Sequence, residues 1–285
     1  MMFFRSIAFF LLISGALLAQ SVYTKTDVDV CNSKFRLAVD NNLKEKPINE
    51  IIEQIGKSFI GLGYEASALD KSDTENLVVH LTGLDCYTFL ENTLVLSRCV
   101  KSGNTTFNDY LKELENIRYR NGKMDGYASR LHYFTDWIYD CGKRGIVKDI
   151  TKELGGIPYK KEINFMSTHP ASYRQLKDNP TLVNDIKAIE KNINSRKYYY
   201  IPKESVAELE KGIKSGDLIA ITTSIEGLDV SHVGIAVREK DGRIHFMHSP
   251  SPGKKIQITP QPLSEYLAAN KKQTGIMVIR AEDKL

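Results

Sequence analysis

The sequence predicts an α+β fold in which helices come first and an antiparallel sheet or small barrel follows. Helical patterns fill the first two thirds of the chain, whereas short apolar or alternating runs bounded by Gly, Asp, Ser or Pro dominate after Lys214. Such segregation of helices from strands is typical of α+β folds. Because 42% of the residues are hydrophobic and 26% are charged, the chain can bury an ordinary globular core.

The N-terminus has the features of a secretory signal peptide. Arg5 precedes an apolar run over 6–18, and the small residue Ala19 follows. The run is shorter than the roughly 20 residues that a membrane span needs, so we expect cleavage after Ala19 and export to the periplasm. The first cysteine, Cys31, lies too far downstream to carry a lipid anchor. The prediction is a signal peptide over 1–19 and one domain over 20–285, with no integral membrane segment.

Helices are predicted over 47–60 and 84–100, where apolar residues recur at helical spacing. Between about 105 and 200, further helical patterns are broken by glycine and proline, which indicates a helical, loop-rich insertion. The part from about 214 to 285 is predicted to be rich in β-structure, with strands over 215–223, 231–237, 243–249, 254–259 and 275–281.

Charge and cysteine content narrow the classes of function. The net charge is +4, and the basic residues are scattered among acidic ones, so nucleic acid is not an expected partner. Four cysteines lie far apart, at 31, 86, 99 and 141. If one of them stays a free nucleophile in an oxidising compartment, at most one intramolecular disulfide can form among the other three. The sequence does not say which two would pair.

Cys86 is the candidate nucleophile. Asp85 is a good N-cap, so Cys86 falls in the first turn of the helix predicted over 84–100. The positive end of a helix dipole lowers the pKa of a thiol, and the thiolate is the reactive form. Free backbone N–H groups at that helix start, including that of Cys86, can also hold the oxyanion of a tetrahedral intermediate.

His232 is the candidate general base, and His248 is the candidate for the group that orients it. The strand over 231–237 places its valines and isoleucine on the core face and His232 on the other face, with space left by Gly234 and Ala236. A three-residue loop with a left-handed Gly242 would pair Gly234 with His248 and bring both imidazoles onto one face. A two-residue turn would separate them. We predict the three-residue loop.

A zinc site formed by His245 and His248 is an alternative that strand geometry opposes. Residues three apart on a strand project to opposite faces, so these two side chains cannot ligate one ion. The sequence also lacks a helical H-E-x-x-H motif. We therefore expect no metal and no other cofactor, and we expect His245 to be an exposed strand residue.

Several segments together resemble a known family. FIGLGYEASALD, ENLVVHLTGLDCYTFLEN and SHVGIAV followed by FMHS are similar to the NlpC-type cell-wall cysteine peptidase superfamily. The closer resemblance, extended by RLHYFTDWI and INFMSTHP, is to its AmiA-like N-acetylmuramoyl-L-alanine amidase family. This resemblance implies a papain-like core and covers most of the chain beyond the signal peptide.

The resemblance also implies roles for individual residues. Cys86 matches the nucleophile of a D-C motif, His232 the base of an H-V-G motif and His248 the third, orienting residue. Tyr64 matches a tyrosine that shapes the oxyanion site. The commoner pattern there is Gly-Thr-Pro-Tyr, whereas this chain has Gly-Leu-Gly-Tyr, and the loss of proline could change the stiffness of the loop.

Substrate contacts are predicted from the middle of the chain and from the residue before the base. These residues combine charge, hydrogen-bonding groups and a flat aromatic surface that suit a sugar or a peptide carboxylate, and they are Arg130, His132, Asp136, Trp137 and Ser231. A structural alternative is that Trp137 belongs to the core and that His132 pairs with Asp136 four residues along a helix.

The reaction implied by the resemblance is hydrolysis of the amide between N-acetylmuramic acid and L-alanine in peptidoglycan fragments, through a thioester on Cys86. The expected partners are therefore muropeptides, with anhydro-muropeptides favoured, and the protein is expected to act as a monomer. Two alternatives remain open. One is an endopeptidase that cleaves between γ-D-glutamate and diaminopimelate, and the other is a non-catalytic protein that captures wall fragments.

Overall fold

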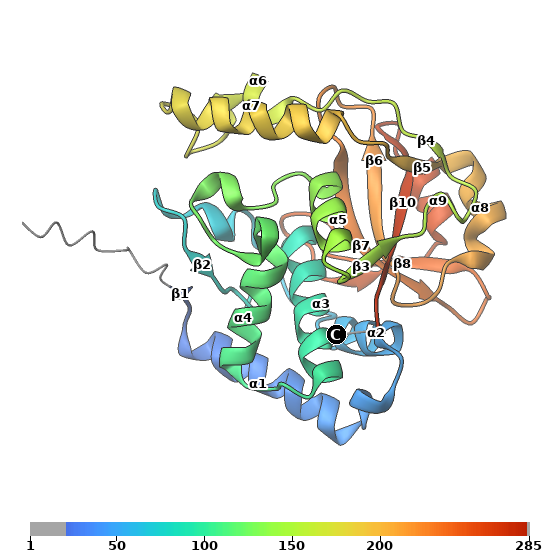
Figure 1. The fold of residues 1–285 in the computed structure, drawn as a ribbon. Coiled ribbons are helices and arrows are strands. Elements are labelled where there is room, and N and C mark those ends of the chain that lie inside the picture. Colours follow the sequence, from blue (N-terminus) through green and yellow to red (C-terminus); the bar gives the residue numbers. More distant parts are fainter. Residues whose placement is uncertain (1–20, 284–285) are drawn as a thin grey trace, which may run out of the picture.

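The computed structural model describes residues 21–283, and the predicted signal peptide over 1–19 lies outside this range. The helices are α1 (Lys25–Asp40), α2 (Ile48–Lys57), α3 (Cys86–Ser102), α4 (Phe107–Arg118), α5 (Phe134–Lys143), α6 (Phe165–Thr168), α7 (Pro180–Asn194), α8 (Val206–Leu209) and α9 (Leu263–Ala268). Helices α1 to α5 lie on one side of the sheet and the short helices α8 and α9 lie on the other, so the fold combines helices with one main sheet, as the α+β prediction requires (Figure 1).

The main sheet has the strand order β4-β5-β10-β6-β7-β8-β9, and β3 pairs with β10 beside it. All its pairs are antiparallel, and in the described part of the chain it stays open and does not close into a barrel. Its strands are β3 (Val147–Asp149), β4 (Ile157–Pro158), β5 (Tyr199–Pro202), β6 (Leu218–Thr223), β7 (Val230–Arg238), β8 (Ile244–His248), β9 (Gln257–Ile258) and β10 (Gln273–Ala281). A separate parallel pair joins β1 (Ser21–Val22) to β2 (Leu77–Val78).

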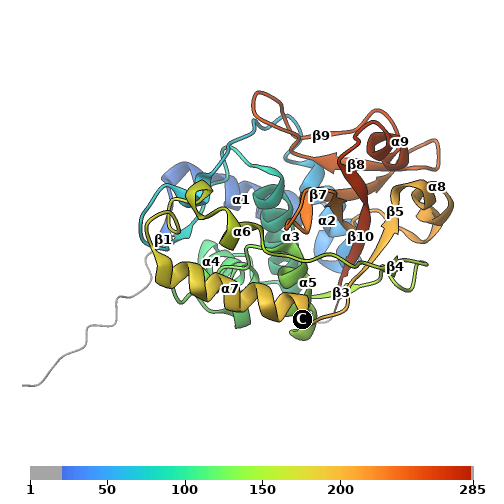
Figure 2. The same ribbon diagram turned by 90° about the horizontal axis from the view of Figure 1, so that it is seen from above.

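Both faces of the central sheet are buried. Val233, Ile235 and Val237 of β7 face a large core shared with the helices, as their alternation predicts. On the opposite face, Ala236 and Phe246 belong to a second core that α9 covers. Helix α3 packs against β7 in both ribbon views, which places the start of α3 near the start of that strand (Figures 1 and 2).

The middle of the chain is less purely helical than predicted. Two short strands, β3 and β4, lie between 105 and 200, a third, β5, begins at the end of this segment, and all three extend the sheet, so the segment is part of the central fold. The helical pattern around residue 135 forms a helix only from Phe134 onward, because Arg130 forms an isolated bridge with Tyr119. Long-range pairing therefore overrides the local helical pattern.

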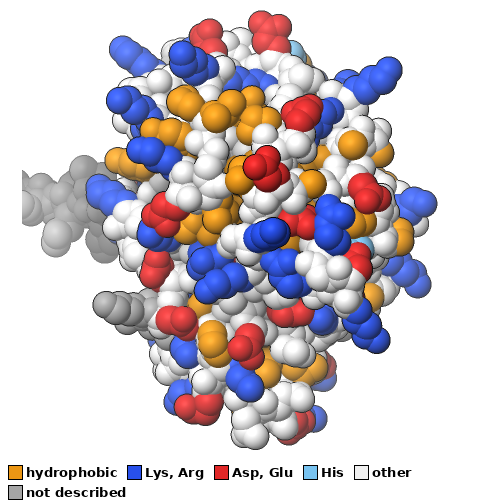
Figure 3. All heavy atoms as spheres, turned by 90° about the vertical axis from the view of Figure 1, so that its right-hand side faces the viewer, with side chains coloured by type: hydrophobic (Ala, Val, Ile, Leu, Met, Phe, Trp, Pro, Cys, Tyr) orange, Lys and Arg blue, Asp and Glu red, His pale blue; other side chains and the backbone are white. Residues whose placement is uncertain are grey.

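The surface carries both signs of charge. On the face shown in Figure 3, Lys and Arg side chains alternate with Asp and Glu, with small apolar areas between them. No helix among residues 21–283 is long and apolar enough to cross a membrane.

Candidate active site

Cys86 is the first residue of α3, as predicted. Asp85 accepts a hydrogen bond from the backbone N–H of Thr88 at 2.7 Å, and the hydroxyl of Thr88 accepts one from the backbone N–H of Asp85. This reciprocal cap satisfies backbone donors that would otherwise have no partner at the helix start. The thiol is thereby held at the N-terminal end of a helix whose following turns are buried.

The charge state of Cys86 differs from the sequence prediction. The residue keeps some exposed surface, but burial of its sulfur and the Asp85 carboxylate raise the pKa of the thiol to about 12. The backbone N–H groups of Val233, Tyr87 and Cys86 itself act in the opposite direction. Desolvation disfavours the thiolate more than the helix start favours it, so the thiol carries its proton in the unliganded protein.

His232 and His248 are brought together by the predicted three-residue loop. Ile235 pairs with Met247 and Arg238 with Ile244, and Gly242 adopts a left-handed φ of 79°. The register prediction is therefore confirmed, and Nε2 of His232 lies 2.6 Å from Nδ1 of His248. Sequence reasoning at the level of one hairpin was sufficient here because loop length sets the register.

The two imidazoles are neutral, and their shared hydrogen bond requires the same tautomer in both rings. Burial lowers the pKa of His232 to about 4, and burial together with the charge of His232 lowers the pKa of His248 to about 3. One ring must donate and the other accept in their shared hydrogen bond. If Nε2–H of His232 donates to Nδ1 of His248, then Nδ1 of His232 is left free to accept the thiol proton. The proton of His248 then sits on Nε2, which is buried without a hydrogen-bond partner among the described residues.

Strand β7 links the thiol to the segment that carries the candidate base. The backbone N–H of Val233, the residue after His232, interacts with the sulfur of Cys86. A register shift between β6 and β7 leaves Ser231 unpaired and exposed beside His232. Bulges of this kind often occur next to active sites, where they redirect a side chain. Ser231 is thus accessible to a substrate, as its predicted role requires.

The space predicted beside His232 is filled. A Cβ added to Gly234 would lie 2.6 Å from the ring of Phe246, and Ala236 is fully buried. The small residues therefore admit an aromatic ring and do not open a groove, so this prediction was wrong. The ring of Phe246 contacts the rings of both site histidines, with centroids 5.6 Å from His232 and 4.7 Å from His248.

Tyr64 lies near the nucleophile, on the loop before β2. Burial raises the pKa of its phenol to about 12, and the charges of Cys86 and Asp85 add to this effect. Its backbone N–H donates to the carbonyl of Lys254. The backbone N–H of Gly61 likewise donates to the carbonyl of Ile256, so hydrogen bonds hold the Gly-Leu-Gly-Tyr segment, which lacks the proline of the commoner pattern. The neutral phenol is a possible hydrogen-bond donor at the site.

Two further residues near the site were missed. Tyr266 of α9 interacts electrostatically with Cys86, and its ring centroid lies 5.3 Å from that of His248. The hydroxyl of Ser249 donates to the carbonyl of Leu84 at 2.6 Å and so ties the end of β8 to the segment before the nucleophile. Ser249 directly follows His248 and could have been noticed. Tyr266 belongs to a short helix with no local signal of function.

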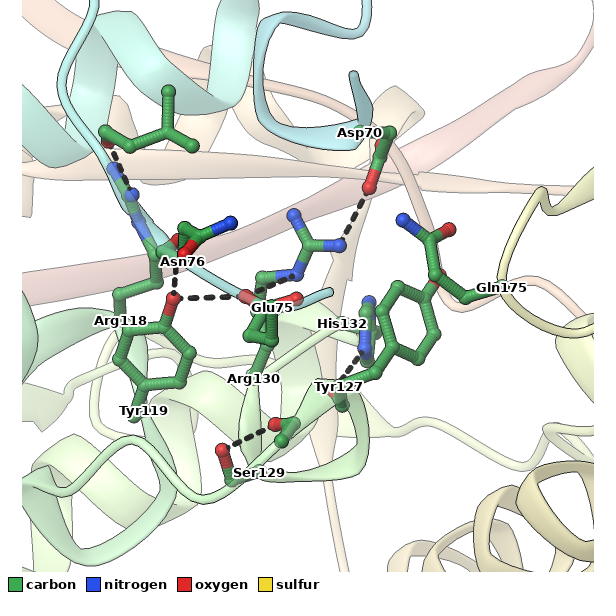
Figure 4. Close-up of polar contacts among 12 residues, drawn as sticks. Asp70, Glu75, Asn76, Arg118, Tyr119, Tyr127, Ser129, Arg130, His132 and Gln175 are labelled. Atoms are coloured by element: carbon green, nitrogen blue, oxygen red, sulfur yellow. Dashed lines mark hydrogen bonds and ion pairs between the residues drawn. The ribbon is translucent and has the colours of Figure 1, made fainter. Parts of the chain in front are cut away.

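Arg130 and His132 line a cavity of about 170 Å³ that also includes Asp85 and Tyr87, the residues on either side of the nucleophile. His132 precedes α5 and bonds through Nε2 to the carbonyl of Tyr127 at 2.8 Å, so it does not pair with Asp136 (Figure 4). Burial and the charge of Arg130 lower the pKa of His132 to about 3.

Asp136 and Trp137 do not reach this cavity, and their predicted substrate contacts were wrong. Asp136 is buried and pairs with Arg120 and Arg196, each at 2.7 Å. Trp137 is fully buried and stacks on Phe134 with ring centroids 4.9 Å apart. Both side chains point into the core because α5 turns this face inward.

His245 is also buried, contrary to its predicted exposure. Its ring bonds to the carbonyl of Thr259 at 2.7 Å and to the carboxylate of Asp241 at 3.0 Å, on the strand face opposite His248. Over the described range, no three His, Cys, Asp or Glu side chains are grouped so that they could hold a metal ion. The four cysteines are all free, and those other than Cys86 are buried.

A larger cavity of about 450 Å³ lies elsewhere, between α7 and the strands β4 and β5. Its lining includes none of the predicted site residues. The smaller cavity is therefore the one adjacent to the candidate nucleophile.

Comparison with protein families and solved structures points in one direction. The model of the AmiA-like family, described as N-acetylmuramoyl-L-alanine amidase-like, matches residues 54–276. A crystal structure of an N-acetylmuramoyl-L-alanine amidase from Bacteroides uniformis is 36% identical, with a TM-score of 0.78 over 82% of this chain and 99% of its own. No curated protein matches the sequence.

Two further structures extend the comparison. A Bacteroides fragilis protein provisionally named a xylanase is 38% identical, with a TM-score of 0.75 over 79% of this chain and 98% of its own. A Legionella pneumophila protein shares the fold at 20% identity, with a TM-score of 0.68 over 91% of this chain and 97% of its own.

Proposed function

The chain belongs to the AmiA-like, N-acetylmuramoyl-L-alanine amidase-like family, and from this premise we propose that it hydrolyses muropeptides with Cys86 as nucleophile. The family and its solved members support a peptidoglycan amidase in general. The bond we propose joins the lactyl carbonyl of N-acetylmuramic acid to the nitrogen of L-alanine. The observation that carries the proposal has two parts: a thiol at the start of α3 that interacts with the backbone N–H of Val233, the residue after His232, and the hydrogen bond between His232 and His248.

The reaction begins with both catalytic groups neutral. As the sulfur of Cys86 attacks the lactyl carbonyl carbon, Nδ1 of His232 takes the thiol proton, and His248 accepts from Nε2–H and stabilises the imidazolium. A buried neutral pair makes this proton transfer part of the bond-forming step. The high thiol pKa then protects the resting cysteine, because only the thiolate reacts rapidly with oxidants and electrophiles.

Collapse of the tetrahedral intermediate breaks the carbon–nitrogen bond. In this mechanism, backbone N–H groups at the start of α3 and the phenol of Tyr64 donate to the oxyanion. His232 returns its proton to the nitrogen of L-alanine, so the stem peptide leaves as an amine. A water molecule, deprotonated by His232, then hydrolyses the thioester, and the muramic acid carboxylate is released with the thiol restored.

The proposal includes the chain's place in a superfamily and in the cell. A nucleophile on a helix that packs against an antiparallel sheet, with the base on that sheet, supports membership of the NlpC-type, papain-like superfamily. The leader-like first nineteen residues support export to the periplasm. There we propose that the protein acts as a monomer on soluble anhydro-muropeptides.

The alternatives differ in product or in site chemistry. A γ-D-glutamyl-diaminopimelate endopeptidase would use the same catalytic residues, and a binding protein would use none of them. Hydrolysis of a glycosidic bond, as the name of the Bacteroides fragilis neighbour suggests for that protein, ordinarily uses two carboxyl groups and not a thiol with imidazoles.

Mass spectrometry of a digested anhydro-muropeptide tests the proposal. We expect an intact stem peptide that begins with L-alanine, together with the free sugar acid, and we expect Cys86→Ala to form neither product. Cys99→Ala, which changes a buried cysteine outside the site, is the matched control and should retain activity. A dipeptide left on the sugar would instead identify an endopeptidase, and no turnover of any muropeptide would favour the binding protein.

A further inference from the structure

A buried arginine, Arg130, lines the cavity beside the nucleophile. Arg130 is only 6% exposed, and its guanidinium lies 5.0 Å from the ring centroid of Tyr127, which fixes its position. One terminal nitrogen donates to Asp70 at 2.5 Å, and the buried Nε forms an ion pair with Glu75 at 3.4 Å that does not meet hydrogen-bond geometry. Figure 4 shows the remaining terminal nitrogen without any contact drawn to it. Buried guanidinium groups normally have all their donors satisfied, so this group has capacity for a further acceptor.

The two acidic neighbours of Arg130 are not equivalent. Glu75 is 5% exposed, lies 3.4 Å from Nε and accepts a hydrogen bond from the hydroxyl of Tyr119 at 2.8 Å. Asp70 is 41% exposed and belongs to the loop between Tyr64 and β2. Glu75 is therefore part of the structure that holds the arginine, whereas Asp70 is a counter-ion that a ligand can replace.

The loop that carries Asp70 is held by weak contacts. Lys71 pairs with Glu65 and Arg174 pairs with Asp73, and in both pairs the side chains are substantially exposed. Exposed ion pairs of this kind contribute little to stability. Movement of this loop therefore costs little free energy. When another carboxylate binds Arg130, the partly exposed Asp70 side chain can rotate into solvent.

We infer that Arg130 binds the α-carboxylate of the D-glutamate residue in the stem peptide, in the position that Asp70 occupies in the unliganded protein. This inference rests on the proposed function and specifies which part of the substrate the cavity receives. In a chain that runs from the lactyl carbonyl through L-alanine to D-glutamate, that carboxylate lies two residues from the attacked bond, at most about 7 Å away. Asp85 and Tyr87, the residues on either side of Cys86, line the same cavity as Arg130, so a substrate that occupies this cavity lies next to the nucleophile.

A guanidinium suits this ligand better than other groups in the cavity do. Its planar fork can donate two parallel hydrogen bonds to one carboxylate, and burial strengthens the interaction. A carboxamide at the same position would present one oxygen and two N–H donors, which would face the arginine's own donors. The site should therefore distinguish a D-glutamate α-carboxylate from its amide.

The experiment compares two substrates that differ only in this group, MurNAc-L-Ala-γ-D-Glu and MurNAc-L-Ala-D-isoglutamine. We expect the wild-type protein to hydrolyse the acid with a kcat/KM at least about tenfold higher than that for the amide. This factor corresponds to the amide losing one hydrogen bond to the charged guanidinium. Arg130→Gln should bring this ratio close to one, and Arg130→Lys should give an intermediate ratio.

Two aspartate variants test the displacement without touching the buried arginine. Asp70→Asn removes the competing carboxylate, so the KM for the acid should fall while the KM for the amide stays unchanged. Asp73→Asn, in the same loop but paired with the exposed Arg174, is the matched control and should change neither value. These variants keep the inference testable if Arg130→Gln does not fold.

The outcomes separate this inference from the proposed function. Equal hydrolysis of both substrates by the wild-type protein would overturn the role of Arg130 and leave the amidase intact. A preference for the acid that survives in Arg130→Gln, or an Asp70→Asn variant with an unchanged KM, would also overturn it. If neither substrate is hydrolysed, the proposed function fails and this inference fails with it.

Discussion

Acidification should destabilise the protein through His248, because this ring is buried in its neutral form. The ring is 1% exposed, and burial holds its pKa at about 3, whereas a histidine in the unfolded chain titrates near 6.5. Between these values the unfolded chain binds a proton that the folded protein excludes. The stabilising contribution of the neutral ring is therefore complete above about pH 6.5 and is lost as the pH falls toward 3.

The magnitude follows from the width of this interval. At pH 5, about 1.5 pH units below the unfolded pKa, the loss is about 1.5 times 1.4 kcal/mol, or about 2 kcal/mol. His248→Asn keeps an acceptor for Nε2–H of His232 but does not titrate. The decrease in the free energy of unfolding between about pH 7 and pH 5 should thus be about 2 kcal/mol smaller in the variant than in the wild-type protein.

Urea unfolding at the two pH values measures this difference, with the fluorescence of Trp137, the single and fully buried tryptophan, as the probe. His245→Asn is the matched control of opposite sign. Burial lowers the pKa of His245, but Asp241 and the carbonyl of Thr259 outweigh this effect and raise it overall. Its proton therefore stabilises the fold at low pH, and its removal should make the acid loss larger. Equal acid losses in the wild-type protein and His248→Asn would refute the reasoning.

Three further predictions concern packing and charge near the site. Gly234→Ala places a Cβ 2.6 Å from the ring of Phe246 and should lower the free energy of unfolding by about 1–3 kcal/mol. Urea titration measures this change, and an unchanged unfolding midpoint would mean that the ring can move aside. Asp85→Asn keeps the helix cap but removes a carboxylate that raises the pKa of Cys86. The pH at the midpoint of Cys86 alkylation by iodoacetamide should therefore fall. An unchanged midpoint would show that the Asp85 charge does not raise this pKa. Glu91→Ala leaves the buried guanidinium of Arg118 without its carboxylate and should lower the free energy of unfolding by about 3–5 kcal/mol. Thermal unfolding would detect this as a markedly lower Tm. A near wild-type Tm would show that the Arg118–Glu91 pair is dispensable.

The elements that carry the candidate catalytic residues were predictable because their determinants are local. Asp85 and Thr88 cap α3 through hydrogen bonds within four residues of each other, so the position of Cys86 at the helix start follows from the chain itself. The left-handed Gly242 similarly determines the hairpin that unites His232 with His248. The helix cap and the hairpin depend on residues close together in the sequence, so the residue pattern and the turn residues predict them directly.

Predictions that required knowledge of packing partners were the ones that failed. A polar and aromatic segment was expected to contact substrate, but α5 buries Asp136 and Trp137 and leaves Arg130 and His132 at the cavity. Likewise, the short strands within the middle segment become visible only when distant strands pair with them. The same residue types can line a core or a cavity, and local periodicity does not distinguish the two.

The sequence by itself determined the α+β order of elements, the helix start at Cys86 and the register that pairs the two histidines, because each is decided by hydrogen bonds and turns within a short stretch of chain. Only the tertiary structure decided which side chains lose water. Packing around the site gives Cys86 a raised thiol pKa and the imidazoles lowered ones, and packing of the segment 119–130 against the loop before β2 buries the guanidinium of Arg130 beside Asp70 and Glu75. Desolvation depends on atoms far apart in sequence, so the electrostatics of the site arise only when the chain has folded.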